Sequence, residues 1–334
     1  MVARLSLSAY LGFKLARAGT PPSEQAAPAP VPVDRIKIAA VQWLAEPVKN
    51  PNEWTERVEA LFRAAAAAHC HLVVFPEYLP MSLLGLIMPE TAGAHTLTDA
   101  TVAEVLKGTA RPLYTFWVRW MAAFARKYGL VTVAGSGLVL ERGRLYNQTV
   151  WLDAQGRMAG RQSKMHPLPD ERRWGVVPAT GPLSNPMQPW GLAGVVCNDA
   201  TYFESFRMLA HKGARVIAVP IADPESRYTV GKARRGCFSA VQDVPMVGVV
   251  SAATGRLFGM RLTGKAGIYL PEELTPDSSG VLAESLQPVG EGLVTGVVSL
   301  AQLSAFRERH QASHPVPPDD FMDALYHNEE AQQC

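Results

Sequence analysis

Short apolar runs alternate with stretches of helical periodicity along most of the chain. Apolar runs that predict strands stand at residues 36–43, 71–75, 130–136, 145–152, 192–196, 216–220, 247–251, 267–270 and 293–300. Apolar residues three or four positions apart predict helices at residues 53–68, 116–128 and 204–212. Strands that alternate with helices are typical of an α/β layered fold. We therefore predict a single α/β domain over residues 36–304.

The two ends of the chain depart from this pattern. Residues 1–35 are predicted to form an N-terminal extension, in which residues 21–33 are a linker rich in Pro and Ala. Residues 1–20 mix Leu and Phe with Arg and Lys. This mixture fits either a strand or a poor amphipathic helix, and it suits a docking arm or a weak membrane or partner contact. Lys14 interrupts the apolar core that a signal peptide needs, so secretion is disfavoured. Residues 305–334 are polar and Pro-containing, which predicts an extended tail that can cross onto a partner subunit.

Composition limits the class of partner. The chain has 334 residues, of which 48% are hydrophobic, and this is enough for a large buried core. The 32 Lys and Arg residues nearly balance the 30 Asp and Glu residues. Such a balance argues against nucleic acid as a partner and favours a small-molecule substrate. No apolar stretch approaches the roughly 20 residues that a membrane-spanning helix needs.

The cysteines indicate a reducing compartment. Cys70, Cys197, Cys237 and Cys334 show no close pairing and no repeated spacing, unlike a disulfide framework or a four-thiolate zinc site. We therefore predict a cytoplasmic protein. The His69-Cys70-His71 run points adjacent side chains in different directions and has no fourth ligand at suitable spacing, so no metal site is predicted there.

Three side chains capable of catalysis follow predicted strands or turns. The strand at 71–75 runs into Glu77, at a strand exit of the kind where α/β folds hold their chemistry. Lys164 precedes a turn that two prolines fix, so its ammonium can point inward. Cys197 ends a buried strand at a turn into a helix, which exposes a side chain and offers backbone N–H groups to an oxyanion. Each residue alone also fits a plain structural role, as a surface Glu, a solvated Lys or an inert Cys. Together they supply the nucleophile, proton acceptor and cation that amide or nitrile cleavage requires.

The order and separation of these motifs resemble the nitrilase, or carbon–nitrogen hydrolase, superfamily from about Ile36 to Leu303. The matching segments are Ala40-Val41-Gln42, Phe75-Pro76-Glu77, Ser163-Lys164-Met165-His166, Cys197-Asn198-Asp199 and Glu291-Gly292-Leu293-Val294. The resemblance implies a four-layer α-β-β-α sandwich that dimerises through helices into a homodimer or larger homo-oligomer, and it implies no metal or organic cofactor. It also implies Glu77 as general base, Lys164 as cation and Cys197 as nucleophile, with Glu171 orienting the lysine.

Some segments depart from the family pattern. The usual Phe-Pro-Glu after the cysteine reads Tyr202-Phe203-Glu204, and the common Arg-Ala-x-Glu-Asn reads Ser239-Ala240-Val241-Gln242-Asp243. Residues 223–242 look most like the amidase-like branch in which some members are fused to an acetyltransferase domain. These changes leave the three catalytic residues intact but leave the substrate open. The predicted substrate-binding or supporting residues are Tyr78, Glu171, Trp174, Asn198, Tyr202 and Arg227.

The activity that the resemblance implies is hydrolysis of a small amide. The non-peptide carbon–nitrogen bond would break through a thioester on Cys197, with release of ammonia or an amine. Three alternatives stay open: a nitrilase, an N-acyltransferase in which an amine captures the thioester, and a non-catalytic binding or scaffold protein. Product analysis with amine acceptors distinguishes transfer from hydrolysis, and selective labelling of Cys197 by an electrophile argues against the non-catalytic alternative.

Overall fold

The first long strand, β1 (Arg35–Ala45), sends its side chains into two different cores. Neighbouring residues of a strand point to opposite faces, so Ile36 and Ile38 enter one core while Val41 and Trp43 enter another. Both faces of this strand are therefore covered, as a layered fold requires. The computed structural model describes residues 6–27, 31–88, 98–225, 227–257 and 259–313.

The described strands pair into one continuous 12-stranded sheet. After β1 they are β2 (Leu72–Val74), β3 (Val131–Glu141), β4 (Arg144–Leu152), β5 (Met158–Ser163), β6 (Leu192–Gly194), β7 (Val216–Ile221), β8 (Val247–Leu257), β9 (Met260–Leu262), β10 (Gly267–Tyr269), β11 (Val281–Glu284) and β12 (Gly292–Ser299). β1 joins two halves, because its residues 35–42 pair with β12 while residues 42–45 pair with β8. One half contains β12 and β1 to β5, and the other contains β6 to β11.

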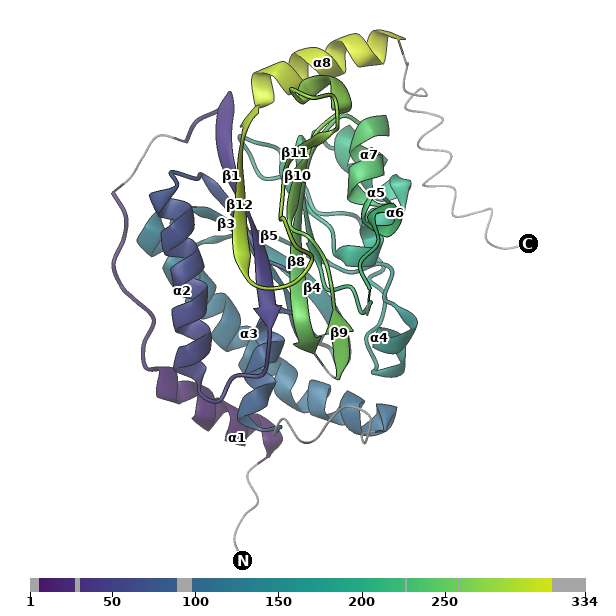
Figure 1. Cartoon of the computed structure of the whole chain (residues 1–334). Coiled ribbons are helices and arrows are strands. Elements are labelled where there is room, and N and C mark those ends of the chain that lie inside the picture. Colours follow the sequence, from purple (N-terminus) through teal and green to yellow (C-terminus); the bar gives the residue numbers. More distant parts are fainter. Residues whose placement is uncertain (1–5, 28–30, 89–97, 226, 258, 314–334) are drawn as a thin grey trace, which may run out of the picture.

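Three hydrophobic cores separate four layers. The helices are α1 (Leu7–Leu15), α2 (Pro51–Ala67), α3 (Asp99–Tyr128), α4 (Pro169–Arg173), α5 (Phe203–His211), α6 (Val230–Ala233), α7 (Cys237–Asp243) and α8 (Leu300–Ser313), with short 3₁₀ helices η1 (Ala16–Ala18), η2 (Leu79–Leu86), η4 (Cys197–Thr201) and η5 (Glu272–Leu274). The middle core joins the facing sides of the two half-sheets. One outer core lies under α2 and α3, and the other lies under α5 and α7 (Figure 1). The predicted four-layer α-β-β-α sandwich is confirmed.

Strand direction brings several strand exits to one end of the sandwich. β2 and β3 run parallel to β1. β5 runs the same way, because it lies two antiparallel steps from β3 through β4. In the other half, β8 is parallel to β1, and β7 and β6 are parallel to β8. The C-terminal ends of β2, β5 and β6 therefore open at the same edge.

Caps explain where the two long helices begin and end. α2 begins after Asn50, whose side chain accepts a hydrogen bond from the Glu53 N–H at 2.9 Å. α3 begins after Thr98, whose hydroxyl caps the first turn, and it ends at Gly129 in the left-handed conformation. The predicted helix at residues 116–128 covers only the second half of α3. The sequence pattern missed the first half because Pro112 interrupts the helical signal there.

The end segments differ in part from the sequence predictions. Residues 7–15 form a helix, α1, and not a strand, and Leu11 and Leu15 of this helix are buried in the outer core beside α3. The predicted extended tail is wrong for residues 305–313, which continue α8. Buried Leu300 and Leu303 anchor the first turn of that helix, and residues 300–313 contain no proline. The remainder of the predicted tail, residues 314–334, lies outside the described residues.

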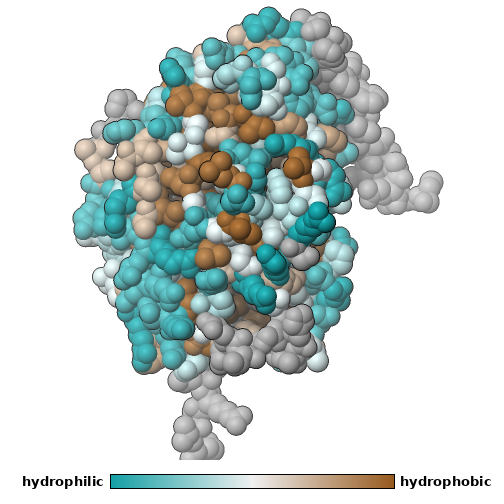
Figure 2. Space-filling view, in the orientation of Figure 1, coloured by the Kyte–Doolittle hydropathy of each residue, from teal (hydrophilic) through white to brown (hydrophobic). Residues whose placement is uncertain are grey.

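One face of the molecule carries apolar side chains between polar ones, over the region of β11 and β12 (Figure 2). Val297 of β12 is exposed, and Leu293 and Val294 are half-buried. Across the described ranges, no helix combines the length and the apolar character needed to cross a membrane. The predicted pairing of subunits through helices stays a prediction.

Candidate active site

The three predicted catalytic residues meet at the shared strand edge. Glu77 follows β2, Lys164 directly follows β5, and Cys197 follows β6 as the first residue of η4. Glu77 and Lys164 are each 1% exposed, and Cys197 is half-buried. Strand polarity therefore brings together side chains that lie 33 to 120 positions apart in the sequence.

The Lys164 ammonium bridges two carboxylates. Its Nζ donates to Glu77 Oε1 at 2.8 Å and to Glu171 Oε2 at 2.7 Å. Both carboxylates stabilise the charged form, so the pKa of Lys164 is raised although burial opposes this. The ammonium has three N–H donors, so two bonds to described residues leave one for a substrate atom.

The two carboxylates on Lys164 differ in proton affinity. Burial raises the pKa of Glu77, and the negative charge of Glu171 adds to this effect. The pKa of Glu171 is lowered, because Lys164, the Tyr78 hydroxyl and the Leu168 N–H together outweigh the effect of burial. Carboxylates whose pKa values move apart are suited to different roles. Glu77 is thus suited to carry a proton, whereas Glu171 is suited to stay charged beside Lys164.

Asn147 of β4 also links the two carboxylates, and the sequence predictions missed it. Its Nδ2 donates to Glu77 Oε1 at 2.8 Å and to Glu171 Oε1 at 3.0 Å. The backbone N–H of Ala222 donates to the other Glu77 oxygen at 2.8 Å. These bonds fix the orientation of the Glu77 carboxylate. A polar residue inside a predicted apolar strand is the signal that could have identified Asn147.

Cys197 adopts an uncommon backbone conformation at the strand-to-helix turn. Its φ is +48°, in the left-handed region that non-glycine residues rarely occupy and that is found at functional turns. The Cys197 thiol and the Glu77 carboxylate lie close enough to shift each other's pKa. Burial and the Glu77 charge raise the pKa of Cys197 well above the usual thiol value, while Lys164 opposes this. These surroundings favour the protonated thiol and place a carboxylate beside it that can take the proton.

Asp199 joins the Cys197 turn to the Lys164 segment, and the sequence predictions missed this role. Its fully buried carboxylate accepts hydrogen bonds from the backbone N–H groups of Met165 at 3.0 Å and His166 at 2.8 Å. The Asn198 side chain adds a bond from Nδ2 to the His166 carbonyl at 3.0 Å. The nucleophile turn and the lysine loop are thus held together by side-chain bonds as well as by packing.

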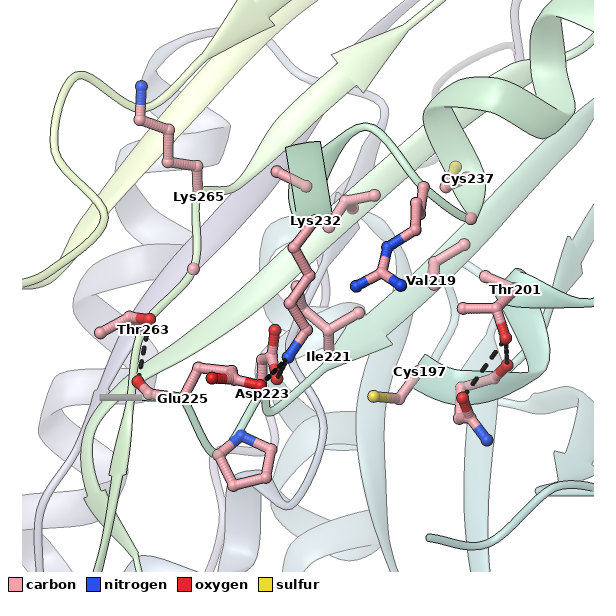
Figure 3. Close-up of a pocket in the computed structure, with 18 of the residues that line it drawn as sticks. Cys197, Thr201, Val219, Ile221, Asp223, Glu225, Lys232, Cys237, Thr263 and Lys265 are labelled. Carbon is pink, nitrogen blue, oxygen red and sulfur yellow. Dashed lines mark hydrogen bonds and ion pairs between the residues drawn. The ribbon is translucent and has the colours of Figure 1, made fainter. Parts of the chain in front are cut away.

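A cleft of about 820 Å³ opens beside Cys197. Figure 3 shows the sulfur of Cys197 pointing into this cleft, with Lys232 reaching over Asp223 and Glu225 on the opposite side. Lys232 Nζ lies 2.6 Å from a carboxylate oxygen of each of these two residues. Cleft-lining residues include Cys197, Phe203, Ile221, Tyr228, Lys232 and Arg235. The cleft therefore combines apolar and charged walls next to a thiol.

The family model for carbon–nitrogen hydrolases matches residues 37–253, which is more than half of the chain. The protein belongs to the carbon–nitrogen hydrolase family. The probable hydrolase YhcX of Bacillus subtilis (strain 168) is 23% identical over 278 residues, covering 82% of this chain and 52% of that relative. This chain thus spans about half the length of the curated relative that it matches.

Solved structures of a nitrilase-superfamily amidase from Nesterenkonia sp. AN1 share the fold. A double mutant of that amidase in complex with acrylamide is 18% identical, with a TM-score of 0.61 and coverage of 87% of this chain and 100% of that chain. A mutant in complex with butyramide is 19% identical, with a TM-score of 0.58 and coverage of 85% and 99%. These likenesses agree with the four-layer sandwich of the carbon–nitrogen hydrolase family, as the sequence resemblance predicts.

The other predicted site residues of this member of the carbon–nitrogen hydrolase family lie in different surroundings. Tyr78 is buried and donates its hydroxyl to Glu171. Trp174 borders a small cavity of about 30 Å³ that Glu77 and Lys164 also line. Asn198 and exposed Arg227 line the large cleft. Their roles toward a substrate stay predictions.

Tyr202, predicted as a substrate-binding or supporting residue, is not among the residues that line the large cleft. Its side chain is 41% exposed, and its ring stacks on His166 with the ring centroids 3.6 Å apart. This stacking holds the ring outside the cleft. Within the described ranges, no group of three or more His, Cys, Asp or Glu side chains could hold a metal ion. Cys70, Cys197 and Cys237 are free thiols.

Proposed function

We propose that this protein is a thiol-dependent hydrolase that cleaves the carbon–nitrogen bond of a small amide through a thioester on Cys197. One observation carries the proposal: the Cys197 thiol lies beside Glu77, a carboxylate of raised pKa that shares the Lys164 ammonium with Glu171, a carboxylate of lowered pKa. This arrangement contains a nucleophile, a proton carrier and a fixed cation in one buried cluster.

In the first half of the reaction, the Cys197 sulfur attacks the amide carbon while Glu77 takes the thiol proton. The carbonyl oxygen becomes negative, and the third N–H of Lys164 can donate to it. The backbone N–H of Asn198 is a second candidate donor at the start of η4. Each such donor typically contributes roughly 3 to 4 kcal/mol to transition-state stability. The intermediate then collapses, the carbon–nitrogen bond breaks, and Glu77 returns its proton to the leaving nitrogen.

In the second half, water replaces the released ammonia or amine. Glu77, again a carboxylate, takes a proton from this water as its oxygen attacks the thioester carbon. Collapse of the second intermediate breaks the carbon–sulfur bond, releases the carboxylic acid and returns a proton to the thiolate. Glu171 keeps its charge through both halves, because its pKa is lowered, and it therefore holds the Lys164 ammonium in position.

The shape of the site supports an amide whose acyl group lies in the large cleft. The acyl carbon bonds to Cys197 Sγ, and this sulfur borders the cleft. Arg227 and Arg235 also line the cleft, so amides that carry a carboxylate belong in a substrate panel beside neutral ones. Complexes of the structurally similar Nesterenkonia amidase with acrylamide and butyramide support a small aliphatic amide as the first compound to test.

The direct test is ammonia release from a panel of amides and nitriles. We expect activity on at least one amide, loss of at least about a hundredfold in the Glu77→Gln variant, and no turnover by Cys197→Ala. Cys70→Ala is the matched control, because Cys70 is a buried free thiol in the outer core under α2 and α3, and this variant should keep full activity. Full turnover by Cys197→Ala would overturn the proposal.

The same panel separates the alternatives. Acid formed from nitriles but not from amides would identify a nitrilase. Hydroxamate formed in excess of acid when hydroxylamine is added would identify acyl transfer, because hydroxylamine then captures the thioester in place of water. A Cys197 thiol that resists iodoacetamide while the panel yields no product would favour a non-catalytic member of the family.

A further inference from the structure

Helix α1, together with Arg17 of the following η1, presents a partly exposed apolar and basic surface. Leu7, Tyr10 and Phe13 are 36%, 40% and 61% exposed. Lys14 and Arg17 follow at spacings of three or four residues from Tyr10 and Phe13, so all five side chains share one stripe. We call these five residues the α1 stripe. Exposed aromatic side chains gathered on one helix face indicate an interaction surface.

The α1 stripe is held rigidly on the body of the protein. Leu11 and Leu15 follow Leu7 at spacings of four residues and are buried in the core that α3 helps to form, so Leu7 lies at the border between the stripe and the buried side of α1. The Leu7 side chain also packs close to Gly108 of α3. Beyond the helix, the Ala26 N–H donates to the Arg126 carbonyl at 3.0 Å and fastens the following segment to α3. Figure 1 places α1 at one end of the molecule, beside α3 and at its outer surface. A partner of the stripe therefore binds the whole protein rather than a loose arm.

Cations lie directly beside the exposed rings. Lys14 Nζ is 5.3 Å from the centroid of the Tyr10 ring, and the Arg17 guanidinium is 5.5 Å from that of Phe13. The sequence contains no Asp or Glu before Glu24. The stripe thus pairs aromatic rings with positive charge and has no acidic side chain of its own to neutralise it.

We infer that the α1 stripe binds the surface of an anionic lipid bilayer. Aromatic side chains favour the boundary between acyl chains and headgroups, while Lys and Arg extend toward anionic headgroups. A second copy of this chain fits less well. A twofold contact would place the same surface on both partners and would bring the positive charges of two stripes together. A bilayer surface supplies the complementary negative charge and the apolar layer at once. Contact through one short helix is reversible and weakens with added salt.

The test measures co-sedimentation of the full chain with vesicles. We expect binding to vesicles that contain phosphatidylserine together with phosphatidylcholine, and little binding to phosphatidylcholine alone. Each juxtamembrane cation changes partitioning about fivefold, so Lys14→Gln combined with Arg17→Gln should weaken binding roughly thirtyfold. Tyr10→Ser combined with Phe13→Ser should also weaken it, with an unchanged unfolding temperature because these rings are exposed.

Matched controls change charge or apolar surface elsewhere. Lys49→Gln with Arg144→Gln removes two exposed cations, and Met158→Ser with Leu286→Ser removes two exposed apolar side chains. Both control variants should bind anionic vesicles like the parent. The inference would be overturned if the protein did not bind vesicles or bound both lipid compositions equally. It would also be overturned if the control variants lost as much vesicle binding as the stripe variants. A stripe-dependent dimer in solution that does not sediment with vesicles would also overturn it and assign the surface to a second copy.

Discussion

Replacing Glu171 by Gln tests the division of roles between the two carboxylates on Lys164. The change removes one negative charge but keeps the size and shape of the side chain. Burial raises the pKa of Glu77, and the charge of Glu171 raises it further. Without that charge, the pKa of Glu77 should fall. Glu77 must be ionised to accept the thiol proton, so the acidic limb of the activity profile should move to lower pH.

The size of this shift follows from the geometry at Lys164. The two carboxylate oxygens lie 2.8 and 2.7 Å from Nζ, so they are at most about 5.5 Å apart. Two unit charges at this separation interact by roughly 3 kcal/mol at an effective dielectric constant of about 20. That energy corresponds to roughly two pKa units. We expect a shift of about one to two units, because the Gln side chain can also reorient within the network.

The assay is the pH dependence of kcat/KM on an amide substrate, measured for the parent and for Glu171→Gln. Glu291→Gln is the matched control, because Glu291 also pairs with a cation, Arg57, at 2.6 Å but lies outside the cluster. The acidic limb of the Glu291→Gln profile should stay at the same pH as that of the parent. An acidic limb that stays fixed or moves upward in Glu171→Gln would refute the assignment of Glu77 as the proton acceptor influenced by Glu171.

Three further changes test the same site. Asp199→Asn should lower kcat at least about tenfold and lower the free energy of unfolding by roughly 2 kcal/mol, because one carboxylate oxygen that accepts backbone N–H bonds is lost. Steady-state kinetics measures the change in kcat, and urea unfolding measures the change in stability. Glu77→Gln should unfold at a higher temperature than the parent. This difference in unfolding temperature should be larger at neutral pH than at acidic pH. The folded-state pKa of Glu77 is raised, so the parent loses stability as pH rises above the unfolded-state value, and Gln does not titrate; an equal difference at all pH values would contradict this. Gly135→Ala should destabilise the fold by roughly 1 to 3 kcal/mol in urea unfolding and reduce kcat. At a φ of +77°, the added Cβ would lie 2.2 Å from the Pro76 carbonyl oxygen, next to Glu77. Wild-type kcat and stability in this variant would contradict the predicted clash.

Much of the fold could be predicted because most strands are buried on both faces. Such strands read as continuous apolar runs, as in residues 216–220 and 247–251. The strand β5 was missed for the opposite reason. It pairs only with β4, and Gln162 is its one buried residue, so neither an apolar run nor alternation marks it. The first half of α3 was missed because Pro112 hides a helix that tertiary packing nevertheless sustains.

The candidate site was predictable where a reactive side chain follows an apolar strand. Glu77 and Cys197 have this context, the proline-fixed turn indicated Lys164, and the family resemblance added Glu171. Asn147 lacks it, because its role depends on two carboxylates that only the tertiary structure brings together.

The two half-sheets set the alignment of the reacting groups. Glu77 and Lys164 leave one half, and Cys197 leaves the other, so the middle core acts as a spacer between proton acceptor and nucleophile. A displacement of about 1 Å between reacting groups can cost roughly a hundredfold in rate. Slippage of one half past the other would therefore stop turnover while each half kept its strands and helices. The rate of turnover therefore depends on how stably the two half-sheets pack against each other. As heat or denaturant increases, activity should be lost before the secondary structure is lost.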